Sequence, residues 1–280
     1  MGTIYGIANQ TGKPDAGAVA AILAMARDAG INMLDTASSY GHSEEALGRA
    51  GVSDWKIVTK VTLMSGLPSA QISSVIHNSV ARSLDLLRCD QLYGVMMHVA
   101  NDLVGPDGER VSEALQDLES KGLCERTGLS FYRPEDLNGL PKSFKATIAQ
   151  APLNPLDQRI VRTRVAQSLT KKGCEVHARS LFLQGLLLMP ASARPKKFGR
   201  WTKELQACDL VLADDPIAKC LGFAAAQSNI ARLIVGVENE AQLSEIISAT
   251  DRAHDPIGTF ELSNEDPELI EPRLWGKYDN

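Results

Sequence analysis

Four ionisable side chains stand at or just beyond the ends of short apolar segments that have the composition of β-strands. Asp35 closes the segment Asn32–Asp35, and Tyr40 follows in the polar turn after it. Lys60 ends the next apolar segment, and His98 follows the one after that. If these segments are neighbouring parallel strands, their carboxyl ends meet at one rim, so the four groups converge there. The sequence therefore predicts a cluster suited to proton transfer.

The chemistry of this cluster centres on Tyr40. A tyrosine hydroxyl has a pKa of about 10 in model peptides, so it needs a neighbouring cation to exchange a proton near neutrality. Lys60 is the candidate cation, and because an inward lysine is costly to bury unpaired, Asp35 on the adjacent strand is its expected partner. His98 is suited to hydrogen-bond a substrate carbonyl or to pass a proton. We predict acid–base catalysis through Tyr40.

The segments that position these groups alternate between buried strands and amphipathic helices. Strands are expected at Asn32–Asp35, Lys56–Lys60, Leu92–Met97, Arg126–Ser130, Thr147–Ala151, Glu175–Ala178 and Arg232–Val235, with a short first strand at Thr3–Ile7. Helices are expected at Ala16–Ala29, Ser69–Leu87, Ser112–Lys121, Asp157–Lys172 and Asn239–Ile247, and another begins at Ser43. Seven or eight such units predict an α/β fold, a (β/α)8 barrel with an abbreviated first strand.

The whole chain, residues 1–280, is predicted to form this one barrel domain, because no repeat or low-complexity linker divides it. Residues 189–198, rich in Pro, Ala, Ser and Lys, are expected to form a long loop over the site face. Residues 255–280 contain several prolines and are expected to form an irregular tail on the barrel exterior.

Composition excludes several classes of function. The chain of 280 residues is 44% hydrophobic and has a formal net charge of −5, without a dense basic run, so we expect no nucleic-acid or anionic-membrane partner. The five cysteines are far apart and form no CxxC pair, which predicts reduced thiols and a cytoplasmic location. No membrane span or signal peptide is expected. The remaining histidines lack metal-ligand spacing, so no metal site is predicted.

Several ordered motifs carry a family resemblance. They are Gly30–Glu44 followed by Leu47 and Gly48, then Val80–Leu87, Leu92–His98 and Leu115–Ser130. Together they resemble the signatures of the aldo-keto reductase superfamily. The resemblance implies that a nicotinamide cofactor lies across the barrel mouth and exchanges hydride with a carbonyl or alcohol carbon. It also implies that Asp35, Tyr40, Lys60 and His98 are the catalytic tetrad.

The resemblance assigns cofactor-binding positions as well. Ser130 and Gln150 match the positions that hold the nicotinamide carboxamide, although the asparagine usual after that serine is Phe131 here. Arg179 replaces a common stacking aromatic and is suited to stack or to contact phosphate, and Ser180 is expected on the pyrophosphate. The remaining candidates are Phe182, Gly236, Gln242 and Glu245, the last at the adenine end.

Cofactor choice depends on the segment Val235–Glu245. It contains no lysine or arginine but carries Glu238 and Glu240, so the 2′-phosphate of NADP would meet carboxylates without a bidentate partner. The cofactor is therefore expected to be NAD or NADP, with NAD favoured. A base from Arg194–Lys197 or Arg200 could compensate for the missing charge.

The substrate is predicted to be a small carbonyl compound or its alcohol. The chain has few aromatic residues and none at Val99–Asn101 beside His98, which favours a polar pocket and hence a sugar or polyol. The segment Leu269–Trp275 also resembles bacterial members among the sugar-modifying oxidoreductases. Two alternatives remain: a non-catalytic nicotinamide-binding regulatory subunit of the same fold, and a hydrolase or lyase with Lys60 as a Schiff-base amine. The chain is expected to be a monomer or a small homo-oligomer.

Overall fold

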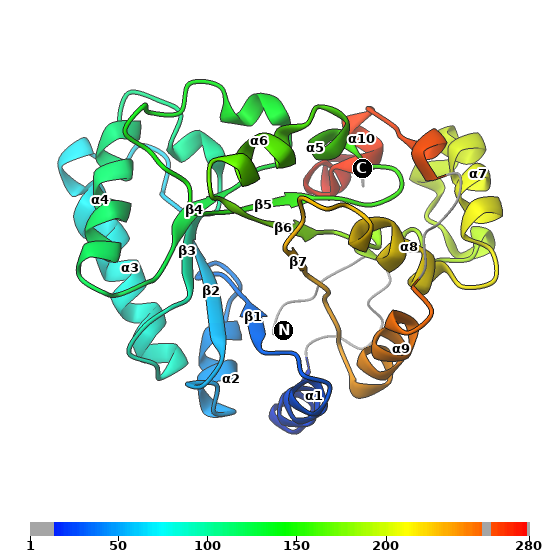
Figure 1. The fold of residues 1–280 in the computed structure, drawn as a ribbon, viewed down its shortest axis with the longest axis horizontal. Coiled ribbons are helices and arrows are strands. Elements are labelled where there is room, and N and C mark those ends of the chain that lie inside the picture. The colour runs from blue at the N-terminus through cyan, green and yellow to red at the C-terminus, as the bar shows by residue number, and fades with distance from the viewer. Residues whose placement is uncertain (1–13, 254–258, 279–280) are drawn as a thin grey trace.

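The structure, a computed structural model, describes residues 14–253 and 259–278. Seven parallel strands pair in chain order: β1 (Met33–Asp35), β2 (Lys56–Val61), β3 (Gly94–Met97), β4 (Thr127–Ser130), β5 (Ile148–Pro152), β6 (Glu175–Arg179) and β7 (Arg232–Leu233). They curl into an arc with the helices on its outer side (Figure 1). Because parallel neighbours need crossover connections, helices fill most of the links between them. This arrangement confirms the predicted (β/α)8 barrel class.

The helices form the outer layer. They are α1 (Ala16–Asp28), α2 (Ser43–Arg49), α3 (Ile72–Leu87), α4 (Gly108–Ser120), α5 (Arg159–Arg162), α6 (Val165–Lys171), α7 (Thr202–Leu212), α8 (Pro216–Ala225), α9 (Glu240–Thr250) and α10 (Pro267–Ile270). Helix α1, which precedes β1, packs against both α2 and α9, the helix that follows β7.

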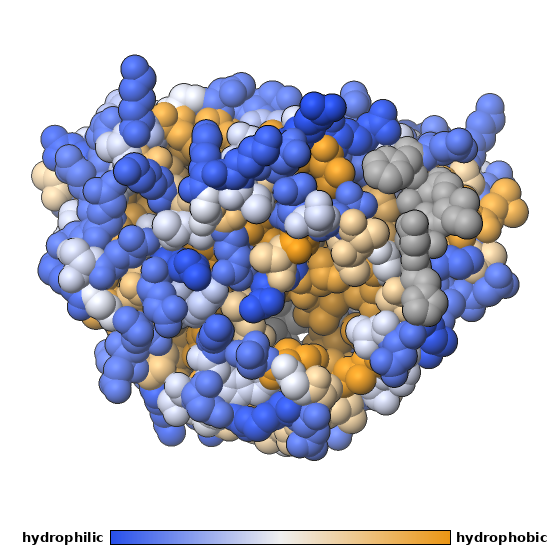
Figure 2. All heavy atoms as spheres, in the orientation of Figure 1, coloured by the Kyte–Doolittle hydropathy of each residue, from blue (hydrophilic) through white to orange (hydrophobic). Residues whose placement is uncertain are grey.

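The arc of strands has a gap between β1 and β7, which do not pair with each other within the described residues. Figure 2, in the orientation of Figure 1, shows hydrophobic side chains gathered around a hollow near the centre of the view. The predicted first strand, Thr3–Ile7, lies outside the described residues.

Alternation along the strands separates two apolar layers. In β2, Ile57 and Val61 pack with the helices, whereas Val58 packs inside the barrel with Met96 and Ile148. Side chains two residues apart on a strand share a face. Lys60 therefore projects into the barrel interior on the same face as Val58, and its side chain is only 1% exposed.

The predicted helix Asp157–Lys172 is wrong as one element, because it is divided into α5 and α6. Arg164 between them has φ 59°, in the left-handed region, which breaks the ladder of helical hydrogen bonds. The predicted loop 189–198 contains a 3-10 turn, Ala191–Ala193, and its last residues already belong to a 3-10 helix, Lys196–Trp201, that leads into α7. Its Phe198 ring meets the Trp275 ring edge-on at 4.9 Å between centroids, so the C-terminal segment packs on this connection.

Candidate active site

Lys60 and Asp35 form a buried ion pair at the carboxyl ends of β1 and β2. Lys60 Nζ lies 2.6 Å from Asp35 Oδ2 and also donates to the carbonyl oxygen of Thr36 at 2.9 Å. Burial lowers the pKa of Lys60, and the carboxylate of Asp35 opposes that shift without cancelling it. The structure thus brings together the lysine and aspartate that the sequence pairs.

The turn that carries Tyr40 is fastened to the end of β2. The backbone N–H and the hydroxyl of Ser38 both donate to the carbonyl oxygen of Lys60, at 3.1 and 2.9 Å. Gly41 has φ 59°, a conformation that glycine adopts without steric cost, and it leads the chain into α2. Lys60 Nζ lies 5.4 Å from the centroid of the Tyr40 ring, so the buried cation faces the tyrosine.

His98 completes the cluster from the end of β3. Its ring meets the Tyr40 ring edge-on with centroids 5.6 Å apart. Its Nδ1 lies 3.1 Å from Ser39 Oγ and 3.3 Å from Thr62 Oγ1. Burial, followed by the positive charges of Lys60 and Arg179, lowers the pKa of His98 to about 4, against a smaller opposing effect of Asp35.

His98 is therefore a neutral imidazole near pH 7. A neutral ring has one N–H donor and one acceptor nitrogen. In the tautomer that carries the proton on Nε2, the hydroxyls of Ser39 and Thr62 donate to Nδ1. His98 can then donate a hydrogen bond from Nε2 to a carbonyl oxygen.

We expect His98 to make the protein less stable as the pH falls from 6.5 to 4. Between these pH values His98 takes up a proton in the unfolded chain but stays neutral in the folded protein. The free energy of unfolding therefore decreases as the pH falls. His98→Gln should reduce the loss between pH 7 and 4.5 by about 1–3 kcal/mol, measured by urea unfolding. The control is His42→Gln, since the His42 side chain is 85% exposed. An equal loss in wild type and His98→Gln would contradict the prediction.

Ser130 and Gln150 are neighbours in the register of β4 and β5, and both are buried. Gln150 Nε2 donates to Asp35 Oδ1 at 2.7 Å, a contact that sequence reasoning did not find. The amide oxygen of Gln150 is then the atom left to accept a hydrogen bond. A nicotinamide carboxamide offers an amide donor and a carbonyl acceptor, which match this oxygen and the Ser130 hydroxyl. The residues present therefore fit that group.

Arg179 links the end of β6 to the loop after β4. It donates to the carbonyl oxygen of Phe131 at 3.2 Å, and its guanidinium lies 4.1 Å from the centroid of the Tyr132 ring. It also donates to Ser180 Oγ at 3.3 Å. Ser180 has φ 58°, a strained conformation for this residue type, and its carbonyl oxygen accepts from Asn154 Nδ2 at 3.0 Å. The guanidinium is thus held in the loop region where a cofactor was predicted.

The other predicted cofactor residues lie in the connections after β6 and β7. Phe182 is half-buried between the apolar layer under the helices and a second apolar cluster around Phe198 and Trp275, whereas Gly236 and Glu245 are exposed. Gln242 uses its side-chain oxygen to accept from the backbone N–H of Glu238 at 2.8 Å, which ties the loop to the first turn of α9. Gln242 therefore helps to hold the conformation of the loop that was predicted to contact the cofactor.

Sequence reasoning missed an ion-pair cluster around Glu271, whose side chain is fully buried. Its carboxylate accepts from Arg133 at 2.5 Å and from Arg159 and Arg273 at 2.7 Å each. Burial raises the pKa of Glu271, but the three guanidinium groups outweigh it and lower the pKa to about 2. Arg273 also lies 4.2 Å from the Tyr132 ring centroid, so the C-terminal segment reaches the loop that Arg179 contacts.

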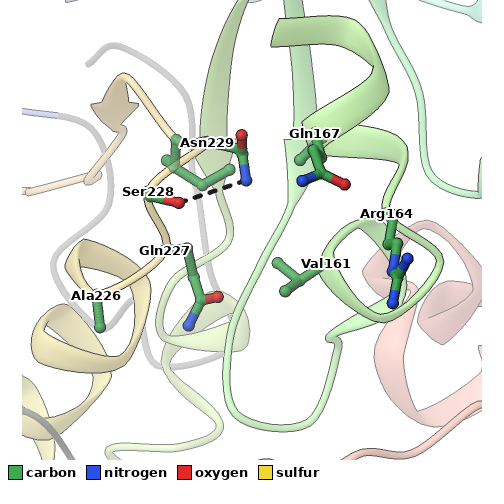
Figure 3. Close-up of a pocket in the computed structure, with 9 residues that line it drawn as sticks. Val161, Arg164, Gln167, Ala226, Gln227, Ser228 and Asn229 are labelled. Atoms are coloured by element: carbon green, nitrogen blue, oxygen red, sulfur yellow. Dashed lines mark hydrogen bonds between the residues drawn. The ribbon is translucent and has the colours of Figure 1, made fainter. Parts of the chain in front are cut away.

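A surface cavity of about 460 Å³ lies away from the tetrad, between α5, α6 and the segment before β7 (Figure 3). Arg164, Gln167, Gln227 and Asn229 are among its lining residues, and none of the tetrad contributes to it. Within residues 14–253 and 259–278, no helix is long and apolar enough to cross a membrane, and no three metal-ligating side chains cluster.

The strand-end rim of this parallel barrel thus joins a tyrosine to a buried lysine–aspartate pair and a neutral histidine, groups suited to proton transfer. The aldo/keto reductase family model matches residues 2–256, and the chain belongs to the aldo/keto reductase family. The reaction class of this family is NAD(P)-dependent oxidoreduction of carbonyl compounds, and its members generally use NADPH.

Solved structures agree with this assignment in fold. The chain is 22% identical to the holo form of aldo-keto reductase AKR11C1 from Bacillus halodurans, with a TM-score of 0.73 over 89% of this chain and 86% of that one. It is 25% identical to a Pseudomonas aeruginosa protein provisionally described as an aldo-keto reductase, with a TM-score of 0.64 over 86% and 84%. The barrel similarity thus extends over most of the chain.

Proposed function

We propose that this chain is a catalytically active oxidoreductase of the alcohol dehydrogenase type, in which Tyr40 exchanges a proton with the carbonyl oxygen of a small substrate. The observation that carries the proposal is the continuous contact from Asp35 through Lys60 and Tyr40 to His98. Each member alone has a structural explanation, but four ionisable groups in contact at one barrel rim are typical of a catalytic site.

The chemistry divides between the cofactor and the chain. Ser130 and Gln150 would hold the carboxamide of a nicotinamide cofactor, which would supply or accept the hydride when bound. In carbonyl reduction, His98 Nε2 donates a hydrogen bond that orients the substrate oxygen, and Tyr40 donates its proton to that oxygen. The ammonium of Lys60 stabilises the phenolate left behind, and Asp35 keeps that ammonium charged in the dry interior. Alcohol oxidation runs through the same groups in reverse.

We propose a small polyhydroxylated carbonyl compound, a sugar or polyol derivative, as the substrate class. Polar groups lie around His98: the hydroxyls of Ser39 and Thr62 contact its ring, and Asn101 and Asp102 follow it in the next turn. Hydroxyl-rich substrates need such donors and acceptors for recognition.

We also propose a cytoplasmic location. All five cysteines are unpaired thiols, which supports it.

The alternative that uses Lys60 as a Schiff-base amine has little structural support. Burial does lower the pKa of Lys60, as an amine nucleophile requires, but its side chain is 1% exposed. Its nitrogen is also engaged by Asp35 and by the carbonyl oxygen of Thr36. An incoming carbonyl carbon would have to displace both contacts. Borohydride should therefore trap no substrate on Lys60.

A fluorescence titration with NADH and with NADPH, followed by a turnover assay, tests the proposal. We expect saturable binding of at least one cofactor and its oxidation in the presence of small aldoses or hydroxyaldehydes. Binding without turnover on any carbonyl compound of the panel would favour the regulatory-subunit alternative. Absence of binding of both cofactors would contradict the oxidoreductase proposal.

We propose that the acids after β7 favour NAD, in contrast to the general preference of the family. Glu240 is exposed in the first turn of α9. Glu240→Arg should raise the affinity for NADPH relative to NADH by about 5- to 10-fold, because a repelling charge is replaced by a phosphate partner. Glu113→Arg, which makes the same charge change at an exposed position on α4, is the control. An unchanged NADPH/NADH ratio in Glu240→Arg would contradict this role of the loop.

A further inference from the structure

We propose that Gln150 is a positioning residue of the proton-transfer network, which acts through Asp35 on the ammonium of Lys60. The inference rests on the proposed function, since it concerns the same site. Its basis is the 2.7 Å hydrogen bond from Gln150 Nε2 to Asp35 Oδ1. The other carboxylate oxygen, Oδ2, receives Lys60 Nζ at 2.6 Å. Asp35 is thus clamped at both oxygens.

Strand pairing alone does not produce this contact. Strand β1 pairs with β2, whereas β5 pairs with β4 and β6. The bond from Gln150 to Asp35 therefore crosses the barrel interior between strands that are not sheet neighbours. Gln150 is 1% exposed, so its amide would lack a water partner if the bond were absent.

The orientation of the Gln150 amide follows from chemistry. An ionised carboxylate only accepts hydrogen bonds, so the NH₂ side of the amide must face Asp35. A hydrogen bond to a charged acceptor in a dry site is stronger than one between neutral groups. Gln150 therefore fixes the plane of the Asp35 carboxylate so that Oδ2 stays directed at Lys60.

The other charged or titratable groups around this pair do not replace Gln150. His177 is the register partner of Gln150 on β6, but its Nε2 lies 2.9 Å from Glu175 Oε1. Burial lowers the pKa of His177, so it adds no cation beside Asp35 at neutral pH. Arg179 donates to Phe131 and Ser180 instead. Lys60 and Gln150 are the side chains that hold the Asp35 carboxylate among the contacts of the described residues.

Loss of the hydrogen bond from Gln150 should weaken the effect of Asp35 that keeps Lys60 protonated. Burial already lowers the pKa of Lys60, and Asp35 is the group that opposes this effect. A carboxylate free to turn away would let Lys60 lose its proton at lower pH. The Tyr40 phenolate would then lose its stabilising cation, and Tyr40 would ionise at higher pH.

Gln150→Met tests this by removing the amide while keeping a side chain of similar length. We expect kcat to fall by about 10- to 100-fold, as for the loss of one hydrogen bond to a charged group. The ionisation of Tyr40 should also move to higher pH. It is measured without cofactor, by subtracting the tyrosinate absorbance of a protein that additionally carries Tyr40→Phe from that of the same protein with Tyr40. Circular dichroism checks that the variant is folded.

Gln150→Glu provides a second, independent signature. Two carboxyl groups at this distance hold one proton between them, because like charges raise the pKa of one member. The protonated form donates to Asp35 as glutamine does, so activity should be largely kept at low pH. At higher pH both groups ionise, the bond is lost, and kcat should fall with a new titration absent from wild type.

Ser130→Ala is the matched control, because Ser130 neighbours Gln150 in register and faces the same predicted carboxamide. It should weaken NAD(P)H binding without moving the Tyr40 ionisation. If Gln150→Met weakens cofactor binding but leaves the Tyr40 ionisation in place, or if Gln150→Glu shows no new titration, the positioning role is overturned. Loss of turnover in Tyr40→Phe alongside such a result would leave the proposed function intact. Full turnover in Tyr40→Phe would instead remove the function on which the inference rests.

Discussion

Tyr40→Phe is expected to lower kcat by about 10²- to 10⁴-fold, the range that a positioned general acid contributes. The phenyl ring keeps the edge-on contact with His98 and the place above Lys60, so the change removes the exchangeable proton and little packing. Cofactor affinity, measured by fluorescence titration, should stay within about twofold of wild type, because the predicted carboxamide contacts come from Ser130 and Gln150.

Tyr93→Phe is the matched control for this experiment. Tyr93 is a buried tyrosine that precedes β3, at the opposite end of the strand from His98, and its hydroxyl donates to Glu175 at 2.5 Å. Its replacement should cost about 1–2 kcal/mol of stability and leave kcat nearly unchanged. Equal turnover in Tyr40→Phe and wild type would show that the tetrad is not used, as a regulatory subunit requires.

The placement of the tetrad was predictable because it depends on local features. Asp35 and Lys60 end apolar segments, and parallel strands joined by helices bring their carboxyl ends to one rim. Tyr40 lies in the turn directly after the first of them, so its position follows from that of Asp35. The 2.6 Å contact of Lys60 with Asp35 agrees with the rule that a buried lysine needs a partner.

Contacts between residues far apart in the chain were not predictable in the same way. Gln150 and Asp35 are 115 residues apart, and their contact depends on the width of the barrel interior and the tilt of its strands. Arg133 and Glu271 are 138 residues apart, and no periodic pattern marks either as paired. The break at Arg164 was missed because a left-handed arginine has no reliable sequence signal, unlike a left-handed glycine.

Glu271→Ala is expected to destabilise the fold by about 3–5 kcal/mol, the range for removal of one partner from a buried ion pair. The change would leave Arg133, Arg159 and Arg273 facing one another without the carboxylate they share. Arg159, only 11% exposed, would keep Asp157 at 2.8 Å but lose its second carboxylate partner. Urea unfolding at neutral pH measures the loss, and Glu261→Ala, an exposed position in the same C-terminal segment, is the control.

The pH dependence separates this electrostatic role of Glu271 from simple packing. The pKa of Glu271 is about 2 in the folded protein and near 4.5 in an unfolded chain, so its contribution is present above pH 4.5 and lost as the pH falls toward 2. Glu271→Gln preserves side-chain volume but removes the charge. It should therefore be less stable than wild type at pH 7, and the difference should shrink by pH 3. A difference that stays constant with pH would mean that the three arginines contact Glu271 without depending on its charge.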